Sequence, residues 1–360
     1  MSLTRFGADG FRNLTPFEIN PSLGINLIVG ENGAGKTSLL EAIHFLSRGR
    51  SFRTNRLERI RQHGRSDFQV FGSASSSNGR VTTLGISKAG RDTIIRVAGN
   101  SVTRLSELAR HLPVVSIGSE SHRLVEDGPE LRRRFLDWSV FHVEHADFSA
   151  WHIYEHALRQ RNAAIRNKLP ITQIRLWDAQ LCEAGEKIDQ ARSALLKASN
   201  PYFLAAVTAL FQTSELKLTY RSGWQVSHSG LQRTLERHIE DDIRRGFTQY
   251  GPHRAELQIT SGGVDVRETL SRGQQKLLVT AMLVAQATYL CNVNGKRSII
   301  LYDDLPSELD VGKRHAVLDL LKQYTGQVFI SAIRPDAVAL PTDMDHSMFH
   351  VEQGRISQVI

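Results

Sequence analysis

The hydrophobic pattern along this chain of 360 residues changes character several times. Residues 25–29 form a short apolar run, and 38–46 carry good helix formers, which predicts a strand, a glycine-rich turn and a helix. Between 67 and 100, apolar and polar residues alternate in short runs broken by Gly, Ser and Asn, as is typical of antiparallel hairpins. The start is a poor strand, because Gly7, Asp9 and Gly10 interrupt the apolar alternation, so its pairing stays open.

From about residue 120 the pattern becomes helical. Between Trp177 and Ala198 apolar residues recur in alternating steps of four and three, which is the spacing of a heptad seam. Residues 151–165 share a second helical face, and Pro170 lies between the two segments. The pattern is equally typical of a short helical hairpin and of two amphipathic helices in an ordinary bundle. Both interpretations predict a helical insert.

The last third of the chain alternates strands with helices. We expect strands at 255–259, 298–302 and 327–330, with helices at 272–289 and 313–324 between them. This alternation predicts a parallel sheet covered by helices. We therefore predict an α/β fold whose head has a mixed sheet and is built from 1–119 and 249–360, with an antiparallel β portion near 67–100. A mainly helical arm, 120–248, would be inserted into this head.

Gly30-Glu31-Asn32-Gly33-Ala34-Gly35-Lys36-Thr37 matches the P-loop spacing G-x-x-x-x-G-K-T, after an apolar strand and at the start of a helix. Glycines let successive backbone N–H groups face phosphate oxygens, and the helix N-terminus adds its positive dipole end. The motif predicts that all eight residues bind ATP, with Lys36 on the β- and γ-phosphates and Thr37 on Mg²⁺. A glycine-rich turn without a ligand is the alternative.

A second candidate site follows the apolar run 299–302. Asp303 and Asp304 end this strand, as in a Walker B motif, where Asp303 would hold the magnesium and Asp304 would act as base or orient the attacking water. Because aspartate is one methylene shorter than the glutamate common at that place, we expect slow hydrolysis. The alternative is two solvated carboxylates that cap a strand.

Ser271 and Gln274 have the spacing of a capping box for the helix that follows them. However, the segment 270–276 precedes Asp303, and Ser307-Glu308-Leu309-Asp310 comes directly after it. Signature, Walker B and D-loop in this order define the ABC class. In that class a second protomer completes the site, so Ser271, Gly273, Gln274 and Asp310 would bind ATP held by the partner's P-loop. We expect an ATP-dependent homodimer, with Lys36, Ser271 and Asp304 as catalytic residues.

With these motifs, four further segments resemble the RecF family of ABC/SMC-type ATPases: 11–13, 49–53, 133–138 and 250–254. The resemblance spans nearly the whole chain. It implies an ABC/SMC-type P-loop ATPase head with a helical arm, or lid, and it adds Arg12 to the nucleotide-binding residues. It also implies a weak DNA-dependent ATPase of recombinational repair and replication-fork maintenance. The partners that it implies are DNA and RecR, with RecO as a further candidate, and the implied role is to help load RecA at gapped DNA and to support the SOS response.

The chain departs from the family and from its wider class at two places. Gly118-Ser119-Glu120 stands where the family usually has a proline before the glutamate, and no Q-loop glutamine is assigned nearby. Ser331-Ala332 follows a predicted strand where ABC transporter ATPases place a histidine. That difference argues against the alternative function, the energy-coupling subunit of a transporter. A small-molecule kinase would have no use for the signature and the D-loop.

Basic residues exceed acidic ones, 45 against 37, which favours a polyanionic partner. Seven arginines but one acid lie between residues 48 and 65, and Arg50, Arg53, Arg56 and Arg59 are our candidates for DNA contacts that do not read sequence. The alternative is a solvated face or intramolecular ion pairs. Arg132, Arg133 and Arg134 could equally face DNA, a partner or the acids of the arm.

Composition excludes several other classes. The only cysteines, Cys182 and Cys291, lack the spacing of a zinc site or a disulfide framework. No stretch reaches the roughly 18 consecutive apolar residues of a membrane-spanning helix, and the first residues lack the apolar core of a signal peptide. We expect a cytoplasmic protein without a membrane partner.

Overall fold

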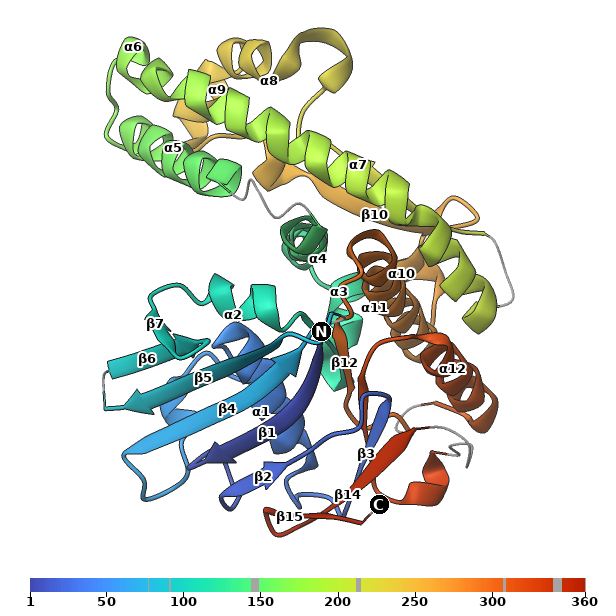
Figure 1. The fold of residues 1–360 in the computed structure, drawn as a ribbon. Helices are drawn as coiled ribbons and strands as arrows, with labels where there is room; N and C mark the ends of the chain where they lie inside the picture. The colour runs from blue at the N-terminus through green and yellow to red at the C-terminus, as the bar shows by residue number, and fades with distance from the viewer. Residues whose placement is uncertain are drawn as a thin grey trace. The chain divides into compact units, whose positions relative to one another are not determined.

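The computed structural model describes residues 1–76, 78–90, 92–143, 149–211, 215–306, 309–338 and 345–359. The chain divides into two compact units, each treated separately below (Figure 1). The head comprises Met1–His122, Ala205–Gln212 and Ser271–Ile360, and the arm comprises Arg123–Leu204 and Thr213–Leu270. Both ends of the sequence thus contribute to one unit.

A six-stranded sheet forms one layer of the head. Its order is β15-β14-β3-β13-β12-β8, and only β15 runs antiparallel to its neighbour. The strands are β3 (Ile25–Val29), β8 (Val114–Ile117), β12 (Ile299–Tyr302), β13 (Val328–Ala332), β14 (His346–Glu352) and β15 (Arg355–Gln358). Every residue of β3, β12 and β13 is buried, as the continuous apolar runs predicted. The predicted parallel, helix-covered sheet is confirmed.

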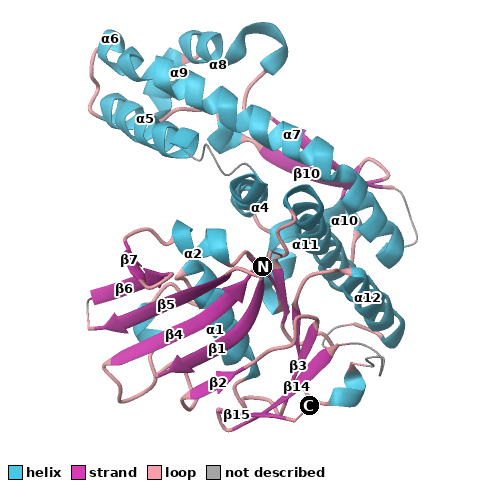
Figure 2. Cartoon of the chain, viewed as in Figure 1, coloured by secondary structure: helices cyan, strands magenta, loops and turns pink. Residues whose placement is uncertain are grey.

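A second sheet of the head is wholly antiparallel, in the order β2-β1-β4-β5-β6-β7 (Figure 2). The strands are β1 (Ser2–Asp9), β2 (Phe17–Ile19), β4 (Asp67–Ser75), β5 (Val81–Ala89), β6 (Asp92–Val97) and β7 (Asn100–Val102). The hairpins expected near 67–100 are therefore present. The opening segment pairs with both β2 and β4, and its register with β4 shifts between Leu3 and Arg5. The ring of Phe71 fills the space of the side chain that Gly7 lacks; a Cβ on Gly7 would lie 2.5 Å from that ring.

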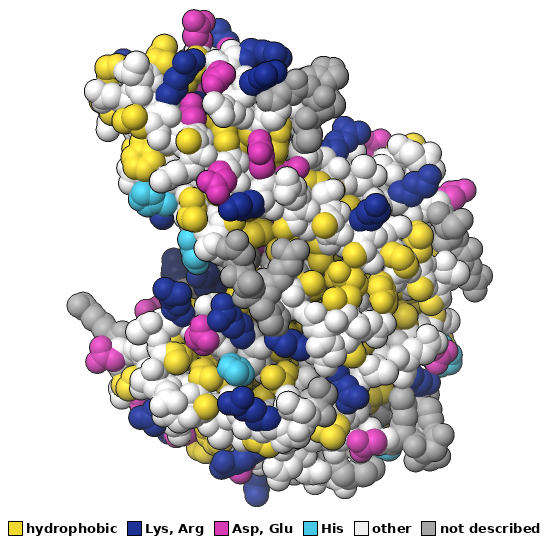
Figure 3. All heavy atoms as spheres, turned by 45° about the horizontal axis from the view of Figure 1, so that its top comes forward, with side chains coloured by type: hydrophobic (Ala, Val, Ile, Leu, Met, Phe, Trp, Pro, Cys, Tyr) yellow, Lys and Arg dark blue, Asp and Glu magenta, His cyan; other side chains and the backbone are white. Residues whose placement is uncertain are grey.

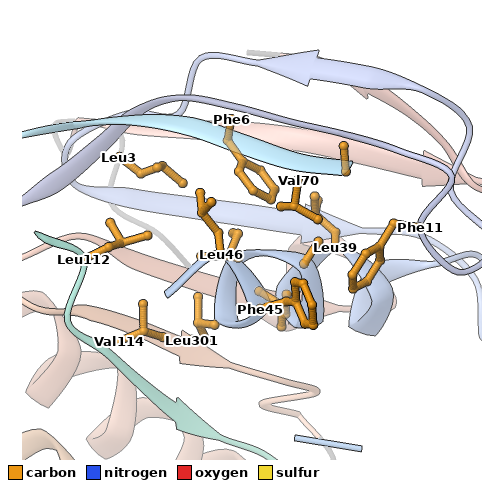
Figure 4. Packing of buried hydrophobic residues seen from close by; sticks show 14 of the residues in the cluster. Leu3, Phe6, Phe11, Leu39, Phe45, Leu46, Val70, Leu112, Val114 and Leu301 are labelled. Atoms are coloured by element: carbon orange, nitrogen blue, oxygen red, sulfur yellow. The ribbon is translucent and has the colours of Figure 1, made fainter. Parts of the chain in front are cut away.

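The helix α1 (Lys36–Arg48) packs against both sheets, and its apolar side chains join the main core of the head (Figure 4). Leu39 and Leu46 of α1 lie near Phe6 and Val70 of the antiparallel sheet, and Val114 and Leu301 extend the same cluster into the parallel sheet. Because this core encloses α1, the loop before it is held at a fixed place at the edge of the sheet.

Further helices of the head are α2 (Ser106–His111), α11 (Arg272–Asn294) and α12 (Val311–Gln323), with the 3-10 turns Leu57–Arg59, Ser119–His122 and Pro335–Ala337. By length and composition, α11 and the segment Ile171–Phe211 could each cross a membrane. However, 67% of the most apolar stretch of α11 is buried inside the protein, as in the core helix of a soluble protein, so this observation is weak evidence for a membrane.

The arm contains mostly helices and one small sheet. Its helices are α3 (Arg123–Glu126), α4 (Pro129–Val143), α5 (Ser149–Arg166), α6 (Ile171–Ile174), α7 (Asp178–Phe211, which ends in the head), α8 (Val226–Arg237), α9 (Ile239–Arg245) and α10 (Val266–Thr269), with 3-10 turns at Arg175–Trp177 and Pro252–Arg254. The seam residues Leu181, Ala184 and Ile188 pack with side chains of α5 and α8. Three helices share this core, which fits the bundle interpretation better than an isolated hairpin.

The boundary of the arm corrects one expectation. Residues 249–270, which we assigned to the head, belong to the arm because β10 (Glu256–Ser261) pairs with β9 (Leu216–Arg221) in a sheet that β11 (Val264–Asp265) completes. The last turns of α7, from Ala205, group with the head instead. Residues 249–270 thus belong to the arm because of strand pairing with a segment that lies about 40 residues earlier in the sequence.

Candidate nucleotide-binding site

The glycine-rich loop 30–35 connects β3 to α1 at the carboxyl end of the parallel strands. Gly33 and Gly35 have positive φ angles of 80° and 122°, which other residues rarely adopt. At Gly30 a Cβ would lie 2.2 Å from the carbonyl oxygen of Val351, so β14 leaves no space for a side chain. No side chain caps α1, and its first N–H groups therefore face the hollow of the loop.

The side chain of Lys36 lies inside this loop. Its ammonium donates to the carbonyl oxygens of Gly30, at 2.7 Å, and of Glu31, at 3.0 Å. Burial lowers the pKa of Lys36, while the carboxylates of Asp304 and Asp303 oppose that shift. The loop thus presents a positive charge where the spacing of the motif places phosphate oxygens.

Thr37 and Asp303 meet directly. The Thr37 hydroxyl lies 3.0 and 2.9 Å from the two carboxylate oxygens of Asp303, which follows β12. The next residue, Asp304, has a φ of 54°, a left-handed conformation that aspartate tolerates better than most residues. The parallel sheet brings together residues of the two predicted motifs that lie far apart in sequence.

Ser331 is a site residue that sequence reasoning missed. At the end of β13 its hydroxyl donates to Asp303 Oδ1 at 2.7 Å and accepts from the backbone N–H of Asp304 at 2.8 Å. It stands where transporter ATPases place a histidine, and we had noted only the absence of that histidine. One serine therefore orients both residues of the predicted Walker B pair.

The donor set fits Mg²⁺. A hydroxyl and a carboxylate are hard oxygen ligands, and Mg²⁺ is usually bound by one or two carboxylates together with substrate phosphates. Among the described residues no group of three or more His, Cys, Asp or Glu side chains could hold a metal by itself. Thr37 and Asp303 would therefore share the ion with the phosphates of a nucleotide.

A cavity of about 800 Å³ opens over these residues, within the size range of ligand pockets. P-loop residues, both carboxylates and Ser331 line one part of it. Its other described lining residues are mostly basic or polar: Arg12, Asn13, Arg53, Arg59, Arg61, Gln62 and His63. A ligand with negative charge at one end and polar groups elsewhere suits this lining.

The predicted signature and D-loop residues lie elsewhere in the head. Ser271 and Gln274 form a closed capping box on α11, since Gln274 N donates to Ser271 Oγ at 3.4 Å and Ser271 N donates to Gln274 Oε1 at 2.9 Å. Asp310 caps α12 by accepting from Lys313 N at 2.9 Å. Neither these residues nor Gly273 are among the described residues that line the cavity. Ser307 and Glu308 lie outside the described residues.

The segment after β8 lies beside Asp303. Asp303 N donates to Ile117 O at 2.7 Å, and a Cβ on Gly118 would be 3.5 Å from the Asp303 side chain. The following turn, Ser119–His122, therefore starts at the edge of the sheet where a Q-loop is expected. This position could not be assigned from the sequence because it carries no glutamine.

The arginine-rich segment is less uniform than its sequence suggested. Arg50, Arg53, Arg56 and Arg59 are exposed. Arg48 is half-buried, and desolvation lowers its pKa to about 10; Arg65 pairs with Asp9 and Asp67. The seven arginines therefore do not all lie free on the surface, and the four candidates for DNA contacts are among the exposed ones. On the face drawn in Figure 3, Lys and Arg side chains stand in small groups among acidic ones.

Two of the family-like segments support the interior of the arm. Arg192 binds both carboxylate oxygens of Asp137 at 2.8 Å and the carbonyl oxygen of Pro252. His253 donates from Nε2 to the Thr248 carbonyl and therefore accepts at Nδ1 from the Tyr154 hydroxyl, at 2.6 Å. Burial lowers the pKa of His253 to about 4, so its ring is neutral at physiological pH.

The three consecutive arginines of α4 are engaged within the arm. Arg132 is buried and pairs with Glu256, Arg133 donates to the carbonyl oxygen of Ala255, and Arg134 pairs with Glu130. Of the three partners that we had considered for them, the acids and carbonyl groups of the arm are the ones observed.

Comparison with known proteins assigns the chain to a family. The model of the RecF/RecN/SMC N terminal domain matches residues 2–357. The DNA replication and repair protein RecF of Azotobacter vinelandii is 42% identical over 363 residues, covering 99% of each chain. This chain belongs to the RecF family. RecF of Coxiella burnetii is 40% identical, covering 96% of each chain.

Solved structures show the same fold. A RecF–ATP structure, described as a recombination mediator in the RecFOR pathway, superimposes with a TM-score of 0.86 at 25% identity and covers 100% of this chain and 98% of its own. An Smc head bound to a domain of ScpA reaches 0.60 at 16% identity, covering 100% of this chain and 98% of its own, and it shows the fold alone. The head is thus an ABC/SMC-type ATPase head, as the RecF-like motifs implied.

Proposed function

We propose that this protein is an ATP-dependent DNA-binding ATPase of DNA replication and recombinational repair. The contact between Thr37 and Asp303, beside the buried ammonium of Lys36, is the observation that carries the proposal. Thr37 and Asp303, the proposed metal ligands from two motifs, both line a cavity large enough for a nucleotide, which supports the proposal. The RecF relatives and the RecF–ATP structure support the same assignment.

Each group at the site has a role in this proposal. The P-loop N–H groups and Lys36 bind the phosphates, and Arg12, which lines the same cavity, also faces the nucleotide. Thr37 and Asp303 would hold Mg²⁺, which would supply positive charge beside the phosphates. Asp304 orients the attacking water and accepts its proton. Because the Asp304 side chain is short, hydrolysis is slow and acts as a timer for a switch.

The signature and D-loop residues would complete the site of a second copy. Ser271, Gly273, Gln274 and Asp310 lie away from the cavity of their own chain, at the N-termini of α11 and α12, where anions bind well. Two heads would therefore enclose two ATP molecules, and the homodimer would form when ATP is bound. Ser271 would then stabilise the γ-phosphate from the partner subunit.

DNA is the proposed partner of this dimer. Arg50, Arg53, Arg56 and Arg59 would contact phosphates of double-stranded or gapped DNA without reading its sequence, and DNA would stimulate hydrolysis. The described role of the RecF structure in the RecFOR pathway supports RecR, together with RecO, as protein partners. Loading of RecA at gapped DNA in the cytoplasm, and support of the SOS response, would follow.

Light scattering on the wild type and Asp304→Asn tests this function. Asparagine retains the left-handed conformation at position 304 but cannot accept a proton. We expect the molar mass to double with ATP and Mg²⁺, more durably in the variant and more readily on gapped duplex. A protein that stays monomeric under every condition would show that Ser271 is only a helix cap.

The DNA contacts need a separate test. Arg50→Gln with Arg56→Gln should weaken DNA binding and reduce the slope of log affinity against log salt by about 1 for each phosphate that is no longer neutralised. Arg134→Gln with Arg244→Gln removes the same charge from exposed sites in the arm and serves as the matched control. If the two double variants have equal salt slopes, DNA does not bind at Arg50 and Arg56.

A further inference from the structure

A single buried carboxylate connects the nucleotide cavity to the arginine-rich segment. Glu41, in the middle of α1, has no exposed surface. Its oxygens accept from Arg12 Nη2 at 2.6 Å and from Arg12 Nε at 2.9 Å, and a third donor is the hydroxyl of Ser51. The guanidinium of Arg53 lies 3.5 Å away. One negative charge is therefore shared by two arginines and a serine.

Two of these partners, Arg12 and Arg53, line the nucleotide cavity, and the third, Ser51, lies in the turn before Arg53. Arg12 lines the nucleotide cavity and has a strained φ of 55°. The Ser51 hydroxyl also accepts from the backbone N–H groups of Arg53, at 2.9 Å, and Thr54, at 3.0 Å, so it holds the turn that begins the arginine-rich segment. Glu41 thus contacts both the cavity wall and that turn.

Arg12 also holds the other end of the segment. The Nη1 group of Arg12 donates to the carbonyl oxygen of Arg59 at 2.5 Å. The backbone N–H of Arg12 donates to the carbonyl oxygen of Ile60 at 2.6 Å. Both ends of the segment 51–60 are therefore attached to the same Arg12–Glu41 pair. A small movement of the Arg12 guanidinium has to change contacts at both ends.

We propose that Glu41 is the positioning residue through which nucleotide binding changes the DNA affinity of the arginine-rich segment. A triphosphate beside Arg12 competes with Glu41 for the guanidinium, and a buried carboxylate cannot remain uncompensated. Glu41 then interacts more closely with Arg53 and Ser51, which fixes the turn and the arginines that follow it. ATP therefore tightens DNA binding, and DNA tightens ATP binding by the same factor. The inference rests on the proposed function.

The DNA affinity with and without the slowly hydrolysed analogue ATPγS measures this coupling. In the wild type the analogue should tighten binding to gapped duplex by about 5-fold or more. Glu41→Gln keeps the shape but removes the shared charge, and Ser51→Ala removes the link to the turn while leaving Arg12 on Glu41. Both variants should bring the ratio of affinities close to 1. If Glu41→Gln folds poorly, Ser51→Ala alone still tests the coupling.

Glu18→Gln is the matched control, because Glu18 also binds an arginine through both oxygens, at 2.7 Å, but on the exposed surface of the head. It should retain the wild-type ratio. If Glu41→Gln and Ser51→Ala also retain it, Glu41 does not transmit the nucleotide state and the inference is wrong.

Hydrogen exchange at the amides of Arg53 and Thr54 separates this inference from the proposed function, since it needs no DNA. ATPγS should slow exchange at these amides in the wild type and in Glu18→Gln, and leave Glu41→Gln and Ser51→Ala unchanged. If ATPγS does not change the exchange rate of these amides in the wild type, the proposed role of Glu41 is wrong. If the wild type shows this protection but does not bind DNA, the DNA-binding function is wrong. The contact from the cavity to the turn through Glu41 would still be supported.

Discussion

The hydroxyl of Thr37 donates to the carboxylate of Asp303, 2.9 and 3.0 Å from its two oxygens, although the two residues lie at opposite ends of the sequence. Thr37 is the second residue of α1, which follows β3, and Asp303 directly follows β12; β13 lies between these two strands in the parallel sheet. If Mg²⁺ binds here as proposed, it would replace the hydrogen bond between Thr37 and Asp303. Nucleotide and Mg²⁺ should therefore bind together.

Asp303→Asn tests this relationship. The amide keeps an acceptor for Thr37 but lacks the charge that Mg²⁺ requires, so we expect at least about a tenfold rise in the Mg²⁺ concentration needed for nucleotide binding. Titration of Mg²⁺ against a fluorescent ATP analogue measures it. Asp319→Asn, on the exposed side of α12, is the control. If the Mg²⁺ titration is the same in Asp303→Asn as in the wild type, Asp303 is not a ligand of the metal.

Ser331→Ala should slow hydrolysis more than it weakens nucleotide binding. The change removes one hydrogen bond to Asp303 and one from the backbone of Asp304, at about 1 kcal/mol each. In the proposed function Asp303 would hold the metal and Asp304 would orient the attacking water. We expect kcat to fall about tenfold with little change in KM, as steady-state phosphate release would show. Ser357→Ala, at an exposed strand, should match the wild type. A pure rise in KM would contradict a role in orienting the carboxylates.

Features with local periodicity could be predicted from the sequence. The helix expected at 272–289 is observed as Arg272–Asn294, and the capping box read from Ser271 and Gln274 is present, because both depend on residues within a few positions of one another. The apolar strand before Asp303 was equally clear. For such elements the local pattern and the tertiary structure agree.

Features that depend on contacts between distant segments could not be predicted. Ser331 gave no signal, since its role exists only because β13 ends beside β12. Glu41 reads as an ordinary helix former until the fold buries it against Arg12. The strand pairing of β9 with β10 moved 249–270 into the arm for the same reason. No periodicity within one segment encodes these relationships.

The arm should lose stability as the pH falls below neutrality. The pKa of His253 is about 4 in the folded protein and near 6.5 when unfolded, so only the unfolded chain takes up the proton between these values. The contribution of His253 to the free energy of unfolding is fully present above pH 6.5. It is lost as the pH falls towards 4, and the loss is about 2 kcal/mol at pH 5. Urea unfolding at pH 7 and pH 5 measures the difference.

Tryptophan fluorescence reports this unfolding, because all four tryptophans lie in the arm, at positions 138, 151, 177 and 224. In His253→Gln, whose amide can still donate to Thr248 and accept from Tyr154, most of this pH dependence should disappear. Equal losses in the variant and the wild type would assign the acid sensitivity to other groups.

Arg161 is the side chain whose removal should destabilise the arm most. It is fully buried and donates to Asp178, Asp242 and Thr248, each at 2.7 Å. Arg161→Met leaves two buried carboxylates without their cation, so we expect the free energy of unfolding to fall by about 3–5 kcal/mol. The matched change Arg134→Met, at an exposed pair with Glu130, should cost less than about 1 kcal/mol. Urea titration followed by tryptophan fluorescence compares them, and similar midpoints would mean that protonation of the two aspartates relieves the buried charge.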